Sequence, residues 1–232
     1  ISEYPESQYV DDALSEKGRS YVLLENSSSA AQAFEKLIRE FPLSSLARKA
    51  GIQLGLLYYN DNQPEKALAA YKQVISNYPG SEEAKIALQD LKSVYIDLND
   101  INAYASYVNS IGGNIRLEVG EQDSLTYIAA AKLFMRGDND GARRSLINYL
   151  QTFPEGAFSS NANFYLGSIA FAKKEFDEAI QRFKSVIASG DTKFLEESVA
   201  RTAEIEYLSK DYPAALESFK RLQIVAENPE NR

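Results

Sequence analysis

The chain has 232 residues, with 25 basic and 33 acidic side chains, a formal net charge of −8, and no His, Cys or Trp. Without His and Cys there is no Ser-His-Asp or Cys-His nucleophile, no thiol redox chemistry and no zinc site of the usual Cys/His kind. The acidic excess is shared equally by the two halves of the chain, so no basic arm is present to capture nucleic acid or an anionic membrane by charge.

The first two units of the chain repeat at a fixed distance. Four prolines, each directly after an aromatic residue, stand at 5, 42, 79 and 154, at intervals of 37, 37 and 75 residues. Between them, a small residue is followed after 12 residues by Ala and after 16 residues by a large side chain. The first unit has these features at Gly18, Ala30, Phe34 and Pro42, and the second has them at Gly55, Ala67, Tyr71 and Pro79.

This spacing predicts a helix–turn–helix in each unit. Two small residues let a pair of antiparallel helices approach closely, and the large ring fills the gap beside them. In the second unit we expect helices over about residues 47–59 and 64–77, separated by the turn sequence YNDNQPE. Apolar residues at steps of three and four, such as Leu54, Leu57 and Tyr58, support this expectation.

The third unit departs from the pattern. Lys92 occupies the position of the first small residue, and Arg116 stands where the proline would be. We expect residues 112–122 to form a loop that bends the array, with Asp123 or Ser124 capping the helix that follows.

The later units return to the pattern. Their small, small and large positions are Ala130, Ala142 and Leu146, then Gly167, Ala179 and Phe183, then Ala203, Ala215 and Phe219. The predicted organisation is repeats 1–3 over residues 1–111, a bend over 112–122, and repeats 4–6 over 123–232. Because ISEYP matches the end of a second helix and no polar capping helix closes the array, the sequence is expected to be a piece of a longer protein.

The repeating unit resembles the tetratricopeptide repeat (TPR). The second unit is the best match, with Leu54, Gly55, Tyr58, Ala67, Tyr71 and Pro79 at that family's positions. The period of 37 is longer than the family's usual 34, so turns or helices are extended. The resemblance, which is to bacterial envelope-type TPR proteins such as those of the Bacteroides group, implies an all-α fold: a right-handed α-α superhelix (solenoid) of about six TPR-like units.

In that family, partner peptides lie in a concave groove formed mainly by the first helices. The positions of this sequence that correspond to groove residues are Arg19, Lys49, Gln53, Tyr59, Tyr127, Phe134, Asn161, Phe164, Phe171 and Tyr207. One recurring position, four residues after the first small residue, is aromatic in four of six units, so an aromatic stripe is one interpretation. The alternative is that these rings pack against the next repeat as core; a groove role requires several of them to be at least half accessible.

The resulting hypothesis is a non-catalytic scaffold that binds a peptide or protein, without metal or cofactor, in a bacterial periplasmic or outer-membrane complex. Two alternatives are a regulatory or spacer module of a larger enzyme or signalling protein, and a glycan-binding lipoprotein, although the absence of Trp disfavours the latter. A carboxylate-only metal or hydrolase site stays open. The acidic pairs at 11–12, 82–83 and 196–197 are explained by their favourable interaction with helix N-termini.

Overall fold

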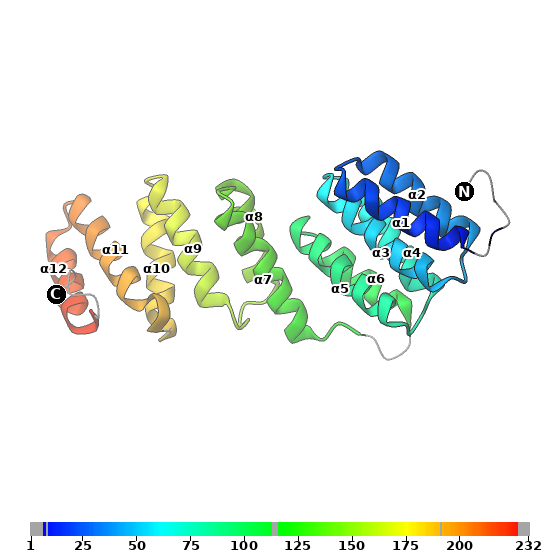
Figure 1. Cartoon of the computed structure of the whole chain (residues 1–232). Coiled ribbons are helices and arrows are strands. Elements are labelled where there is room, and N and C mark those ends of the chain that lie inside the picture. The colour runs from blue at the N-terminus through cyan, green and yellow to red at the C-terminus, as the bar shows by residue number, and fades with distance from the viewer. Residues whose placement is uncertain (1–6, 8, 113–115, 191, 227–232) are drawn as a thin grey trace. The chain divides into compact units, whose positions relative to one another are not determined.

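The computed structural model describes residues 7, 9–112, 116–190 and 192–226. Within these ranges the chain forms twelve α-helices and one short 3-10 helix, and no strand (Figure 1). The helices are α1 Val10–Leu23, α2 Ser27–Glu40, α3 Ser45–Asn60, α4 Pro64–Asn77, α5 Glu82–Asp97, α6 Ile101–Ile111, α7 Val119–Met135, α8 Asn139–Thr152, α9 Ser159–Ala172, α10 Phe176–Ser189, α11 Leu195–Leu208 and α12 Tyr212–Val225. The predicted all-α fold of about six helix–turn–helix units is confirmed, and the helices expected at 47–59 and 64–77 are α3 and α4.

The chain divides into two compact units, Ile1–Leu98 with α1–α5 and Asn99–Arg232 with α6–α12. Inside each unit, consecutive helices pack on one another, and first helices of neighbouring pairs also touch, as α1 touches α3 and α7 touches α9. The division therefore falls between α5 and α6, whereas the repeat pattern placed α6 with repeats 1–3. The assignment of repeats to 1–111 and 123–232 stays a prediction.

The small and large positions of the pattern meet inside the first two helix pairs. A Cβ added at Gly18 would lie 2.4 Å from Phe34 Cε1, and one at Gly55 would lie 2.4 Å from Tyr71 Cε1. Both rings are buried. The glycines thus allow a close approach of the two backbones that any side chain would block.

The turn between the two helices of a pair has one backbone feature in common in all six pairs. Each turn contains one residue in the left-handed region: Glu25, Asn62, Asn99, Gly137, Lys174 and Lys210. In the second pair, the Asn62 amide donates to the Tyr59 carbonyl and the Gln63 amide donates to the Tyr58 carbonyl. This is the Schellman arrangement, which satisfies the last carbonyls of the first helix. The turn therefore repeats at nearly the same stride as the core.

The predicted loop at 112–122 is too long at its C-terminal end. Helix α6 ends at Ile111, and Gly112 has a φ of 79°, but α7 already begins at Val119. Residues 113–115 lie outside the described residues. The residue before α7 is Glu118, in an extended conformation and without a side-chain cap, so neither Asp123 nor Ser124 caps this helix; Asp123 is buried inside it.

No helix in the described ranges has the length and apolar character needed to cross a bilayer.

Candidate functional site

Helices α1, α2 and α3 enclose a pocket of about 370 Å3, here called the α1–α3 pocket. Three of the predicted groove residues line it: Arg19 from α1, and Lys49 and Gln53 from α3. The structure therefore brings these three side chains to one place, and their role in binding a partner stays a prediction. Its lining residues are Asp12, Ser15, Glu16, Arg19, Phe34, Leu46, Lys49, Ala50 and Gln53.

The mouth of the α1–α3 pocket carries both signs of charge above an apolar floor. Arg19 Nη1 pairs with Glu16 Oε1 at 3.0 Å, one turn away on the same helix, and both side chains are exposed. Lys49 is exposed, and among the described residues it has no ion-pair partner. Phe34 and Ala50 are buried beneath them. Lys49 is thus a solvent-exposed cation beside apolar surface, where it can meet a carboxylate of a ligand.

The neighbouring first helix, α5, places a carboxylate close to the core of the same unit. Burial raises the pKa of Asp90 above its ordinary value. Its negative charge also contributes to raising the pKa of Tyr71, after the larger effect of burial on that ring.

The aromatic stripe does not form an open surface. Tyr59 is half-buried and donates a hydrogen bond to Asp97. Phe134 stacks on Tyr165 with ring centroids 4.6 Å apart, and the guanidinium of Arg201 lies over the half-buried Phe171. Only the ring of Tyr207, at 58% exposure, meets the requirement of half accessibility.

Two further groove candidates are core residues. Tyr127 and Phe164 are buried, with ring stacking of 4.5 Å onto Phe158 for Tyr127 and 4.2 Å onto Phe194 for Phe164. Burial raises the pKa of Tyr127, whose hydroxyl accepts a hydrogen bond from Asn161 at 3.2 Å. The prediction that Tyr127 and Phe164 line a groove is wrong, because these first-helix rings fill the space between consecutive pairs.

A buried polar cluster was missed by the sequence interpretation. Tyr149 Oη donates to Asp123 Oδ1 at 2.6 Å, and the Ala157 amide donates to Asp123 Oδ2 at 2.8 Å. Tyr149 Oη also accepts from the Phe158 amide at 3.0 Å. The cluster fixes the turn between α8 and α9, so its role is structural. Asp123 was interpreted as a possible helix cap, because nothing in the local sequence indicates that its side chain points into the core.

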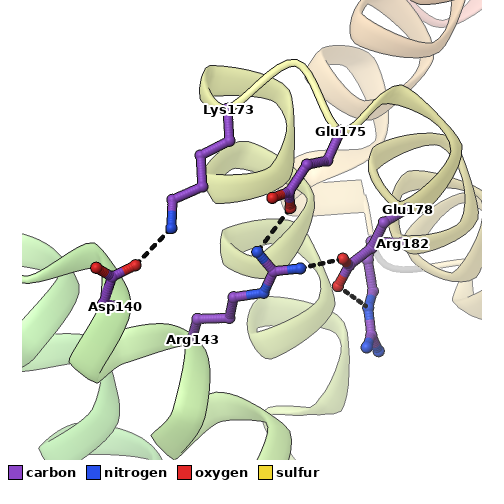
Figure 2. Close-up of polar contacts among 6 residues, drawn as sticks. All are labelled: Asp140, Arg143, Lys173, Glu175, Glu178 and Arg182. Carbon is purple, nitrogen blue, oxygen red and sulfur yellow. Dashed lines mark hydrogen bonds and ion pairs between the residues drawn. The ribbon is translucent and has the colours of Figure 1, made fainter.

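A second polar cluster joins consecutive repeats on the surface (Figure 2). Arg143 of α8 contacts Glu175 at 2.6 Å and also Glu178, while Lys173 contacts Asp140. These pairs run from α8 to the turn before α10 and to α10 itself. We call them the α8–α10 ion-pair bridge; every charge in it already has a protein partner, which favours a structural role.

The repeated small–large contacts, the six matching turns and the stacked helix pairs define an α-helical hairpin-repeat protein. Family models described as "Tetratricopeptide repeat" match residues 12–44, 50–81 and 130–192, together more than half of the chain. The chain therefore belongs to the tetratricopeptide repeat family. Proteins with this repeat are in general scaffolds for protein–protein interaction and are not catalytic.

Several solved structures are similar to this chain. A tetratricopeptide repeat protein from Parabacteroides merdae is 16% identical over 96% of this chain and 82% of its own, with a TM-score of 0.42. Pseudomonas aeruginosa pilF is 12% identical over 96% and 94%, with a TM-score of 0.43. YrrB, described as "a TPR protein with an unusual peptide-binding site", is 18% identical over 87% and 96%, with a TM-score of 0.43. The likeness to proteins of the Bacteroides group stays a prediction.

No curated protein matches the sequence significantly.

Proposed function

We propose that this chain is a non-catalytic scaffold that binds an extended peptide segment of a partner protein at the α1–α3 pocket. The observation that carries the proposal is the convergence of Arg19, Lys49 and Gln53 around an apolar floor formed by Phe34 and Ala50. Apolar floors with a few polar groups at the mouth are typical of sites that anchor one or two side chains.

The chemistry of the pocket favours a peptide with an acidic residue next to an apolar one. Lys49 supplies a charge with no protein partner among the described residues, whereas Arg19 is already engaged by Glu16. Gln53 offers an amide that can both donate to and accept from a peptide backbone. The apolar residue of the peptide would cover Phe34.

Selection from a displayed peptide library on the immobilised chain tests this function. We expect enrichment of peptides with an acidic residue beside an apolar one, and loss of their binding in Lys49→Glu. Lys220→Glu is the matched control, because Lys220 is an exposed lysine of α12, remote in sequence from this pocket. Failure to enrich any peptide, or equal binding by wild type and Lys49→Glu, would contradict the proposal.

We also propose a place for this scaffold in the bacterial envelope, in a periplasmic or outer-membrane complex. The support is the likeness of its repeats to envelope-type proteins. Fractionation of cells that express the natural full-length protein tests this location; recovery in the cytoplasmic fraction alone would contradict it.

A further inference from the structure

The first helix of the sixth pair, α11, carries buried polar residues at positions where the first helices α3, α5, α7 and α9 carry apolar or aromatic ones. Ser198, Thr202 and Glu206 follow one another at steps of four and are all buried. At the corresponding positions, α3, α5, α7 and α9 have only apolar or aromatic residues. These residues are Ala50, Leu54, Tyr58, Ala87, Leu91, Tyr95, Leu125, Ala129, Leu133, Ala162, Leu166 and Ala170.

This polar stripe requires a physical explanation, because burying a hydroxyl or carboxyl group costs free energy unless hydrogen bonds compensate it. Thr202 donates to the Ser198 carbonyl at 2.8 Å, but the Ser198 hydroxyl has no hydrogen-bond partner. The buried polar residues of α11 are therefore not explained by a gain in core stability.

Thr202 and Glu206 line a pocket of about 400 Å3 between α10, α11 and α12, here called the Glu206 pocket. Its apolar wall includes Ile187 of α10 and Val199 of α11. The side chain of Glu206 is only 7% exposed. The pocket thus combines an aliphatic wall with a single deeply placed carboxylate.

The two oxygens of Glu206 are held unequally. Ser218 Oγ donates to Oε2 at 2.6 Å. Oε1 has Lys184 Nζ at 3.5 Å, which is longer than the 2.7–2.9 Å of a typical charge-assisted hydrogen bond. Lys184 is also 60% exposed, so little free energy holds it in place. Oε1 is therefore available to a better-placed cation.

The remaining charges of the pocket do not favour an anion. Glu217 and Arg221 are exposed, opposite in sign and one helical turn apart on α12, so their fields largely cancel. An anionic ligand would have to lie beside the buried carboxylate of Glu206. A cation on an aliphatic stem matches both the carboxylate and the apolar wall.

We propose that the Glu206 pocket binds a lysine or arginine side chain of a partner protein. The stem of that side chain lies against Ile187 and Val199, and its cationic group replaces Lys184 at Glu206 Oε1. This site is separate from the α1–α3 pocket and has the opposite charge preference. The chain then holds an acidic segment at one pocket and a basic residue at the other.

An NMR titration of the whole chain with an acetylated, amidated Ala-Ala-Lys-Ala-Ala peptide tests the proposal. We expect shifts of amide signals in α10, α11 and α12, and no comparable shifts with the same peptide carrying norleucine in place of lysine. Glu206→Gln keeps the size of the side chain and an acceptor for Ser218, and should weaken binding by about tenfold or more.

Lys184→Met provides a readout that a purely structural Glu206 would not give. Removing the competing cation should tighten binding of the lysine peptide, whereas a structural role predicts no gain. Glu217→Gln, in the same pocket but exposed, should change affinity by less than about twofold. Circular dichroism checks that each variant is folded, and if Glu206→Gln unfolds, Lys184→Met decides.

The proposal is overturned if the lysine and norleucine peptides bind alike, or if neither binds. It is also overturned if Lys184→Met binds the lysine peptide no better than wild type. A titration with inorganic phosphate tests the opposite charge preference. If phosphate binds, Lys184→Met abolishes that binding and the lysine peptide does not bind, the pocket is an anion site.

Discussion

Gly55 shows how one absent side chain sets the distance between two helices. Even a methyl group at this position would lie 2.4 Å from the buried ring of Tyr71. We therefore expect Gly55→Ala to lower the free energy of unfolding by about 1–3 kcal/mol through overpacking, although Ala is the better helix former. Urea unfolding monitored by circular dichroism measures the change.

The control for this substitution is Gly120→Ala. Gly120 lies in the first turn of α7, with no atom within 4 Å of its added Cβ. At this position only the higher helix propensity of Ala acts, so Gly120→Ala should raise the free energy of unfolding by up to about 1 kcal/mol. A stabilising Gly55→Ala would show that the close-packing role of Gly55 is wrong.

Asp90 gives a pH dependence of known sign. Burial raises its pKa in the folded protein above the ordinary value of 3.8, so the folded state binds the proton more tightly than the unfolded chain does. The stabilising contribution is complete below 3.8 and is lost as pH rises through the folded pKa. Asp90→Asn should therefore raise the melting temperature at neutral pH, and this gain should vanish below pH 3.8. A gain that is the same at every pH would contradict burial as the cause.

At the scale of elements, the sequence predicts the helix pairs well and the connections between them poorly. Helices α3 and α4 were predicted from the packing residues Gly55, Ala67 and Tyr71, because residues of these types recur at a constant spacing along the chain. The loop at 112–122 was misplaced because a turn of helix can begin at Val119 without a capping side chain. The left-handed turn residues escaped notice because lysine and glutamate occupy several of these positions.

The α8–α10 ion-pair bridge is the element-scale contact with the clearest energetic consequence. Arg143→Met keeps most of the aliphatic stem and removes the charge shared by Glu175 and Glu178. Because Glu175 then loses its cation, and the partly buried Glu178 keeps only the longer contact with Arg182 at 3.7 Å, we expect a loss of about 1–3 kcal/mol in the free energy of unfolding. Screening should reduce this loss at high salt.

Lys85→Met is the matched control for the bridge. Lys85 pairs with Glu82 within one helix, and both side chains are exposed. Its removal should cost no more than about 0.5 kcal/mol. Chemical denaturation of both variants at low and high salt makes the comparison; equal losses would contradict a special role for the contact between repeats.

For the whole molecule, the constant stride was sufficient to predict the fold, because each pair repeats one packing solution. The site was predicted less completely. Arg19, Lys49 and Gln53 were identified by their positions on first helices. Position in the repeat does not, however, distinguish the exposed ring of Tyr207 from the half-buried ring of Phe171 at the same position. Burial depends on the neighbouring pair, whose contacts are set by residues far away in the sequence. The Glu206 pocket is recognised only when α11 is compared with the corresponding helices of the other pairs.

The same dependence on neighbours predicts a difference between two equivalent phenylalanines. Phe183 and Phe219 occupy the same position in consecutive pairs, yet Phe183 is fully buried in a cluster with Ile205 of α11, whereas Phe219 is 45% exposed. Phe183→Ala should therefore cost about 3–5 kcal/mol of unfolding free energy. Phe219→Ala should cost less than about 2 kcal/mol, since less apolar surface is lost from the core. Urea titrations of both variants give the ratio, and equal losses would mean that a surface outside the described residues covers Phe219 in solution.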